Sequence, residues 1–369
     1  MSGVGGRGPL LALAGLPGMG PARLGALLAR WPAAEAWEFV RGGDLPGDAG
    51  VSDHLVASWR AAAAAVDVEA LVAAHRAAGI EVVAATDDAF PAPLRDDPEP
   101  PAVLFVRGRL DALTARRVAV VGTRRCTWSG RLVARDLGRD LAAAGVCVLS
   151  GLALGIDGEA HQGALDGHGG PVGVVGTGLD VVYPRRHAAL WERVASAGAL
   201  VSEYPLGTTP ERWRFPARNR LLAALAEAVV VVESGSRGGS MHTVDAALER
   251  DRPVLAVPGP VRSAASAGTN GLLAAGCPPC RDAADVLVAL GLTTPHPSSS
   301  PDAGDGAAAP APADAEDALV LDALGWEPAT LDELAERLGV PLGPLAVRLT
   351  RLAGGGWLVQ RAGWWERAR

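Results

Sequence analysis

The sequence contains no lysine: all 34 of its basic residues are arginine. The P-loop that binds nucleoside triphosphates requires a lysine, so that class of site is excluded. Cysteine is also scarce, with four residues among 369, and a chain of this length is therefore not a disulfide-stapled scaffold. Cys277 and Cys280 form a single Cys-x-x-Cys without a second pair or a nearby histidine, which argues against a zinc site. These absences predict a reduced, cytoplasmic protein without a metal.

A membrane-spanning run is missing as well. The apolar segment Leu10–Leu16 is preceded only by Arg7 and is ended at once by Pro17 and Gly18. It is too short for a membrane span and short for the apolar core of a signal peptide, so we expect a buried helix and no membrane partner. The formal net charge of −7 argues against nucleic acid covering the whole surface, but it allows one basic groove.

Composition divides the chain into four parts. Residues 1–76 are rich in Ala, Leu and Trp and predict a small helical domain. Within it, Gly15–Gly20 followed by Pro21–Leu28 fits either a helix-hairpin-helix, whose backbone N–H groups approach a phosphate, or a plain connector in a helix bundle. Residues 77–292 form the central domain described below. Residues 293–315 lack bulky side chains and predict a flexible linker.

Residues 316–369 predict a winged helix, with helices over Ala318–Leu324, Leu331–Leu338 and Leu342–Leu352 before a Trp-rich hairpin. Thr330, with Asp332 and Glu333 after it, suits the start of the second helix. This part carries eight acidic residues and six arginines, and its presumed recognition helix offers only Arg348 and Arg351. Duplex DNA favours a basic face, so we expect this domain to contact protein or to assist weakly.

The central domain alternates short Val-rich runs with helical stretches. Continuous apolar strands are typical of a parallel sheet covered on both faces, and strand–helix alternation predicts right-handed βαβ units. We therefore predict an α/β fold with an extended, Rossmann-like, doubly wound and mostly parallel sheet. The predicted strands are Val118–Val121, Val146–Leu149, Val172–Val175, Ala199–Val201, Val229–Val232 and Val254–Val257.

Glycine and arginine gather in the loops that follow these strands. In an open parallel sheet such loops meet at one edge, where ligands bind. Residues 116–237 hold fifteen arginines against eleven acidic residues, so a basic region lies within an acidic chain. We expect Arg218 and Arg220 at the start of a helix over Leu221–Ala226, where a cation is disfavoured by the helix dipole unless it binds an anion. The alternative is surface pairing with Glu211 or Glu227.

Enzymatic sites receive little support. No strand is followed by G-x-G-x-x-G with an acidic residue about 20 positions later, which argues against a dinucleotide cofactor. Asp157, Glu159 and His161 lie within one helical turn and fit an acid–base or metal set. The interpretation we favour is that Asp157 caps a helix over Gly158–Leu165 with His161 beside it.

Several ordered motifs together resemble the DNA-processing protein A family, also called DprA or Smf. The resemblance covers the whole central domain, and each motif alone is weak. This sequence departs from the family pattern at Thr123, where serine is usual, and in the segment Glu233–Thr243. The matching motifs are Val120–Arg124, Ser150–Asp157 with Ala160–His161, Gly178–Pro184, Ser202–Pro205, Phe215–Arg220, Val257–Gly259 and Gly268–Asn270, with Phe90–Leu94 and Leu104–Gly108 upstream.

The resemblance implies a non-catalytic protein without a cofactor that binds single-stranded DNA regardless of sequence. It also implies protection of incoming DNA in natural transformation, loading of the RecA recombinase, and a homodimer through the central domain. Phe215 fits either a base-stacking ring or a core aromatic, and Asn219 fits either a base contact or loop support. The candidate DNA-binding residues are Gly122, Thr123, Arg124, Gly151, Arg185, Phe215, Arg218, Asn219, Arg220, Gly238, Gly239 and Ser240.

Two other functions fit parts of the pattern. A nucleotide phosphoribohydrolase, of the lysine-decarboxylase-like kind, also places a glycine-rich loop after a strand, but its Pro-Gly-Gly-x-Gly-Thr is not reproduced by Arg237–Thr243. A transcription regulator would combine the winged helix with a ligand-sensing Rossmann domain, and the acidic C-terminal part counts against it.

Overall fold

The computed structural model describes residues 7–46, 50–167, 170–292, 314–325, 328–361 and 363–368. Almost all of the predicted linker, residues 293–315, lies outside these ranges. In the described residues, no helix combines the length and the apolar character needed to cross a bilayer.

Five helices come first, as the composition of residues 1–76 predicts. Their core contains Leu11, Leu13 and Trp59, each almost completely buried. The indole of Trp59 donates a hydrogen bond to the Pro17 carbonyl (2.8 Å), which fixes the connector between the first two helices. The helices are α1 (Arg7–Ala14), α2 (Pro21–Leu28), α3 (Ala33–Gly42), α4 (Asp53–Ala63) and α5 (Val68–Ala77).

An eight-stranded sheet follows, in the order β1-β2-β6-β5-β4-β3-β7-β8. All six predicted Val-rich runs form strands, and these six are parallel. The two strands that the runs did not predict, β1 and β2, add an antiparallel pair at the β6 side. The strands are β1 (Glu81–Ala84), β2 (Val103–Gly108), β3 (Arg117–Val121), β4 (Cys147–Ser150), β5 (Val172–Val174), β6 (Ala199–Ser202), β7 (Ala228–Val231) and β8 (Val254–Ala256).

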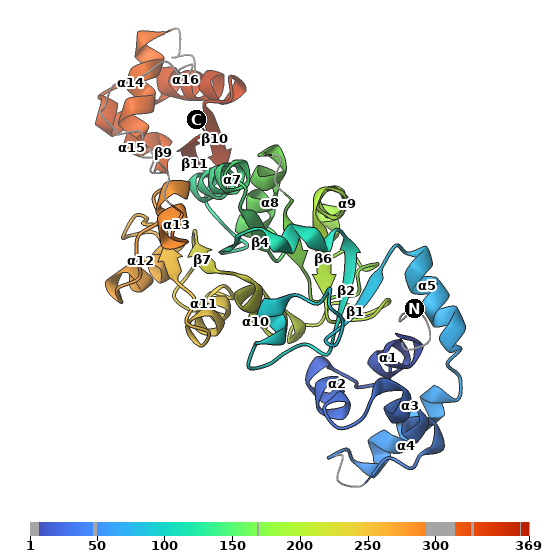
Figure 1. Ribbon diagram of the computed structural model, residues 1–369. Coiled ribbons are helices and arrows are strands. Elements are labelled where there is room, and N and C mark those ends of the chain that lie inside the picture. Colours follow the sequence, from blue (N-terminus) through green and yellow to red (C-terminus); the bar gives the residue numbers. More distant parts are fainter. Residues whose placement is uncertain are drawn as a thin grey trace.

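Helices cover both faces of the sheet (Figure 1). Alternate residues of β3 point to opposite faces: Val118 and Val120 pack with α7, α8 and α13, whereas Ala119 and Val121 pack with α10 and α11. The helices are α6 (Ala92–Arg95), α7 (Trp128–Ala143), α8 (Ile156–Asp166), α9 (Ala188–Ala197), α10 (Arg214–Leu225), α11 (Met241–Leu248), α12 (Ala267–Ala274) and α13 (Ala283–Ala289), with short 3₁₀ segments η2 (Leu110–Thr114) and η3 (Arg185–His187). The predicted doubly wound, mostly parallel fold is confirmed.

The strand order reverses at β3. From this strand the chain builds outward through β4, β5 and β6 on one side and then through β7 and β8 on the other. The loops that follow β3 and β7 therefore lie where the strand order changes direction at the carboxyl edge, which is the usual ligand site of such sheets.

The last part of the chain is a winged helix, as predicted. Thr330 accepts a hydrogen bond from the Glu333 backbone N–H, and the Glu333 carboxylate accepts one from the Thr330 N–H, so the predicted helix start is a full capping box. The elements are α14 (Ala315–Leu324), β9 (Ala329–Thr330), α15 (Leu331–Leu338), α16 (Leu342–Gly354), β10 (Leu358–Arg361) and β11 (Trp364–Arg367), with the strands in the order β10-β11-β9.

The winged helix lies against α7 (Figure 1). The backbone N–H of Trp128, the first residue of α7, donates to the Glu366 carboxylate of β11 (3.0 Å). A carboxylate at a helix N-terminus is stabilised by the helix dipole. This contact places the wing beside the loop that follows β3.

Candidate nucleic-acid interface

The loops that follow β3, β4 and β7 meet at the point where the strand order reverses. The Thr123 N–H donates to the Glu233 carbonyl (2.7 Å), and the Ile156 N–H donates to the Thr123 carbonyl (3.3 Å). A Cβ on Gly122 would lie 2.6 Å from Ile156 Cγ1 and 2.7 Å from the Glu233 carbonyl oxygen. Only glycine allows three loops to approach this closely. The sequence prediction that these loops gather at one edge is correct.

An exposed stack of side chains borders these loops. The Arg124 guanidinium carbon lies 5.2 Å from the centre of the Phe215 ring, and the Tyr183 ring lies 5.3 Å from Phe215 at a tilt of 33°. Arg124 is exposed, Tyr183 is 38% exposed and Phe215 is half-buried. Phe215 is therefore part of a surface stack rather than of a hydrophobic core, which resolves the alternative that the sequence left open.

Arg185 lies on η3, two residues after Tyr183, and its side chain is exposed. The segment is held in place by His187, whose Nδ1 donates to the Leu152 carbonyl (2.9 Å). Because Leu152 lies in the loop after β4, this bond brings Arg185 to the same edge as Arg124. We use the name switch-point groove for the surface formed by Gly122–Arg124, Tyr183, Arg185, Phe215, Asn219 and Gly239, beneath which Gly151 and Arg218 are buried.

Arg218 differs from its predicted setting. We expected it at the start of a helix beginning at Leu221, but α10 begins at Arg214, so Arg218 lies in the second turn and only 4% of it is exposed. Its Nη2 donates to the Gly151 carbonyl (3.3 Å), and a Cβ on Gly151 would collide with the guanidinium. Nε and Nη1 have no hydrogen-bond partner among the residues described.

A buried carboxylate accompanies this buried cation. Asp157 Oδ2 accepts a hydrogen bond from the Gly151 N–H (3.1 Å). Burial raises the pKa of Asp157, and the nearby Arg218 opposes that rise. Burial also lowers the pKa of Arg218 to about 10, with Asp157 acting in the opposite direction. Arg218 therefore stays charged at neutral pH and adds a positive field beneath the groove without touching solvent.

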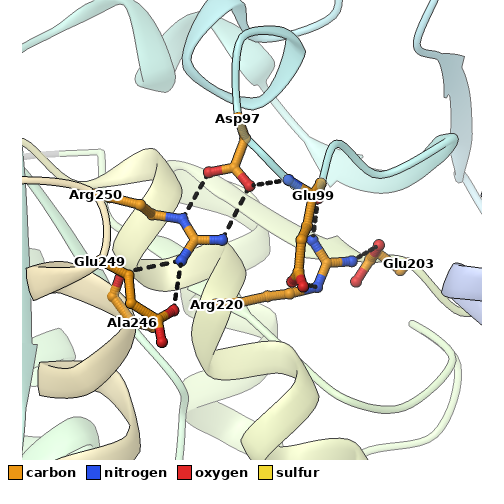
Figure 2. Close-up of polar contacts among 7 residues, drawn as sticks. All are labelled: Asp97, Glu99, Glu203, Arg220, Ala246, Glu249 and Arg250. Carbon is orange, nitrogen blue, oxygen red and sulfur yellow. Dashed lines mark hydrogen bonds and ion pairs between the residues drawn. The ribbon is translucent and has the colours of Figure 1, made fainter.

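Arg220 is not a free phosphate contact (Figure 2). Its Nη2 lies 2.5 Å from Glu203 Oε1, and its Nη1 donates to the Glu99 carbonyl (2.6 Å). Only 18% of the Arg220 side chain is exposed, so the prediction that it binds DNA is wrong as to geometry. The alternative of surface pairing with Glu211 or Glu227 is also wrong for Arg220, because its partner is the buried Glu203. Burial raises the pKa of Glu203 to about 7, and the charge of Arg220 opposes the rise.

A second buried pair lies beside the first (Figure 2). The Asp97 carboxylate accepts two hydrogen bonds from Arg250, at 2.6 and 2.9 Å, and both side chains are almost completely buried. The first pair joins α10 to the end of β6, and Arg220 also joins α10 to the loop after α6 through the Glu99 carbonyl. The second pair joins that loop to the turn after α11. They fix the position of α10, which carries Phe215, Arg218 and Asn219.

The glycine-rich loop after β7 is more closed than expected. Ser240 is 7% exposed, and its hydroxyl donates to the Ser234 hydroxyl (2.8 Å), so it is not directed at a ligand as we predicted. The Gly238 N–H donates to the Gly235 carbonyl (2.9 Å). Gly239 is exposed, and its carbonyl accepts a bond from Asn219 Nδ2 (3.3 Å), which favours loop support as the role of Asn219.

The candidate catalytic set does not converge. His161 is fully buried, its Nε2 donates to the Val172 carbonyl (3.2 Å), and burial lowers its pKa to about 4. Glu159 instead faces Arg131 at 3.8 Å. The helix cap is Gly155, with φ +81°, and not Asp157, so that prediction is also wrong. Each side chain serves the local packing of α8.

Sequence reasoning missed three residues near the groove. Tyr183 was recognised only as part of a motif, although it stacks on Phe215. Arg212 and Trp213 are exposed and directly precede α10. Their position next to Phe215 was the available signal, because a cation and an aromatic ring before a stacking residue are typical of single-strand binding surfaces.

Comparisons with known proteins agree with this geometry. The family model for DNA recombination-mediator protein A matches residues 81–291, and the model for the DprA winged helix domain matches residues 305–363. The putative DNA processing protein DprA of Mycobacterium tuberculosis is 39% identical over 363 residues, which cover 93% of this chain and 91% of that protein. Protein Smf of Escherichia coli is 38% identical, over 78% of this chain and 77% of that protein.

Two solved structures are also similar. DNA processing protein A from Streptococcus pneumoniae has a TM-score of 0.64 at 31% identity, over 75% of this chain and 95% of that one. A structure that describes the single-stranded DNA binding mode of DNA processing protein A from Helicobacter pylori has a TM-score of 0.51 at 29% identity, over 57% of this chain and 95% of that one.

Proposed function

This chain belongs to the DNA recombination-mediator protein A family, and from that premise we propose that it binds single-stranded DNA through the switch-point groove, without sequence preference. The observation that carries the proposal is the exposed stack of Arg124, Phe215 and Tyr183 beside the closely packed loops. A base stacks on an aromatic ring whatever its identity, and a guanidinium beside the ring binds the adjoining phosphate.

The geometry assigns different tasks to the candidate residues. Arg124, Arg185 and Arg212 are exposed and neutralise phosphates, whereas Phe215 and Tyr183 stack bases. Gly122 and Gly151 allow the loops and the Arg218 guanidinium to approach one another. Arg218 contributes positive electrostatic potential from beneath the groove. The supporting elements are held in place by Arg220, Asn219, Gly238 and Ser240.

The further role is that of a mediator rather than an enzyme. In our proposal the protein acts in the cytoplasm as a dimer through the central domain, protects incoming single strands during natural transformation and helps load the RecA recombinase. The name of the matching family supports mediation in recombination. The absence of convergence between Asp157, Glu159 and His161 supports a non-catalytic role.

A salt series of DNA titrations tests this proposal. Labelled poly-dT and duplex DNA are titrated by fluorescence anisotropy against the wild type, Arg124→Ala and Arg185→Ala. Three phosphate contacts predict that log affinity for poly-dT falls with log salt at a slope of roughly −2, and that each variant makes this slope about 0.7 shallower. The matched control is Arg109→Ala, because Arg109 is 67% exposed and lies beside the start of β6, at the opposite edge of the sheet.

Two results would contradict the proposal. One is equal affinity of the wild type for duplex and single strands. The other is an unchanged salt slope in both groove variants. Turnover of free nucleotides by the purified protein would instead support the phosphoribohydrolase interpretation.

A further inference from the structure

A second concave surface lies on the other side of α10 from the switch-point groove. It is a cleft of about 1110 Å³ between the α1–α2 connector and the segment that leads from β6 to α10. Its walls are the glycine-rich connector Gly15–Gly20, the segment Tyr204–Thr209 and the α10 residues Arg214, Ala217 and Arg220. All of these lining residues belong to the part of the chain that the structure describes.

Helix α10 faces both surfaces. Phe215, Arg218 and Asn219 lie on the side of the helix that borders the groove. Arg214, Ala217 and Arg220, spaced three apart, lie on the side that borders the cleft. With 3.6 residues per turn, the two sets are centred about 150° apart around one helix, with Arg214 and Arg218 at the boundary between them. A flexible strand that leaves Phe215 reaches the cleft by crossing the N-terminus of α10.

Trp213 stands at that crossing. It precedes α10, is 52% exposed and lines the cleft. The Arg214 guanidinium carbon lies 5.0 Å from the Trp213 ring centre and 5.2 Å from that of Tyr204. This layered arrangement orients the indole and leaves about half of its surface open. Arg212, which is also exposed, directly precedes Trp213 in the chain.

Two polar groups in the cleft wall lack a protein partner among the described residues. Only 5% of Tyr204 is exposed, and its buried hydroxyl makes no hydrogen bond within the described residues. The Nε of Arg214 is also buried and also makes no hydrogen bond within the described residues. Buried polar groups without a partner are unusual and costly, and both of these belong to side chains that line the cleft.

The charge of the cleft decides between a phosphate and a base. Glu203 and Glu99 lie at its floor around Arg220 (Figure 2), and Glu211 accepts a hydrogen bond from the Trp213 indole (2.5 Å). The cleft wall also carries Arg23, Arg214 and Arg220, so its formal charges nearly cancel, and Arg214 and Arg220 are already paired with Glu211 and Glu203. A phosphate therefore gains little there, whereas carboxylates accept hydrogen bonds from amino and imino groups. An aromatic ring with donors and acceptors around it suits a flat, uncharged heterocycle.

We propose that the cleft binds an unstacked nucleobase of the same single strand, stacked on Trp213, one step beyond the strand's contacts in the switch-point groove. This inference rests on the proposed function. It adds a second base site, and it gives the N-terminal helical domain a part in DNA binding, because one wall of the cleft is the α1–α2 connector.

An abasic scan tests the inference. One abasic position is moved along a 20-mer of dT, and each oligonucleotide is titrated against the wild type, Trp213→Ala and Phe215→Ala. At one position the missing base weakens binding by the wild type about tenfold, and the same loss disappears in Trp213→Ala. At a different position the loss disappears in Phe215→Ala. Trp213→Phe, which keeps an aromatic ring, retains most of the affinity.

The outcomes separate the two proposals. If an abasic position is coupled to Phe215 and none to Trp213, the cleft is not a base site and only this inference is overturned. If neither variant changes binding to any oligonucleotide, the proposed function fails as well. If Trp213 and Phe215 are coupled to the same position, they form one site and the second base site is refuted. Trp364→Ala is the matched control, because Trp364 is 42% exposed on the winged helix.

Discussion

Some arginines at the carboxyl edge of the sheet are exposed and others are buried, and their positions in the sequence do not distinguish the two groups. Arg124 and Arg185 are exposed and lie beside aromatic or glycine-rich segments. Arg218 and Arg220 are withdrawn into the protein, where Asp157 and Glu203 compensate their charge. An exposed guanidinium is available to a phosphate, whereas a buried one supports the scaffold.

Substitution of Arg220 by Ala is expected to destabilise the fold. The change leaves Glu203, which is 3% exposed at its side chain, without its countercharge, and the expected loss is about 3–5 kcal/mol. Without Arg220 the pKa of Glu203 rises further, so the folded state binds more protons than the unfolded state. In the wild type Glu203 already has a pKa of about 7, so the additional loss of stability in the variant develops as the pH rises above about 7.

Urea unfolding of Arg220→Ala at several pH values checks this prediction. Arg124→Ala is the control, because an exposed substitution changes stability by at most about 0.5 kcal/mol. Equal stability of the two variants at every pH would show that the Arg220–Glu203 pair does not hold α10.

At the scale of elements, contacts between loops and at helix ends determine the geometry of the groove. The loop after β3 packs against the loops after β4 and β7 through backbone atoms, with Gly122 at the closest point. Helix α10 in turn is held by the Arg220–Glu203 pair, and the Asp97–Arg250 pair fixes the loop that Arg220 also contacts. The groove therefore depends on contacts that contain no DNA-binding side chain.

Substitution of Gly122 by Ala is expected to separate these loops. The added methyl group meets the Ile156 side chain and the Glu233 carbonyl, both within 3.0 Å, and overpacking of this kind costs about 1–3 kcal/mol. Both the melting temperature and the affinity for poly-dT should fall. Gly235→Ala is the matched control, since the neighbour nearest to a Cβ at that position, the Ala264 carbonyl oxygen, would lie 3.8 Å away. A Gly122→Ala variant as stable as this control would disprove the close packing.

At the scale of the whole molecule, the third helix of the winged helix presents paired rather than free arginines. The two arginines of its third helix are engaged internally: Arg348 with Asp314 (3.3 Å), and Arg351 with Asp314 (3.0 Å) and Asp317 (2.5 Å). Glu366 holds the wing against α7. Val347, which is 71% exposed, gives the outer side of the third helix an apolar surface instead of a basic one.

The affinity of the full chain for duplex DNA should therefore not depend on these arginines. Arg351→Ala is expected to change duplex affinity by less than about twofold, because a paired and screened cation adds little to phosphate binding. Fluorescence anisotropy with a duplex at low salt measures the effect, and Arg109→Ala again serves as the control. A loss much larger than that of the control would establish the winged helix as a duplex reader.

The sequence by itself determined the elements and their order. Val-rich runs, the 3.6-residue period and the Thr330 capping signal are local patterns, and they correctly predicted the six parallel strands and the winged helix. The start of α10 was wrong because Trp213 offers no side-chain cap and Pro216 suggested a loop, although proline is tolerated in a first helical turn. The boundaries of the domains stay predictions.

Only the tertiary structure decided which candidate side chains face a ligand. Arg220 is paired with Glu203 and with Glu99, which is 121 positions away in the chain. The turn of the loop after β7 brings the Ser240 hydroxyl to the Ser234 hydroxyl, to which it donates a hydrogen bond. Arg218 is buried against Gly151, which lies in the loop after β4. Burial and pairing depend on distant segments brought together by packing, and no local pattern encodes them.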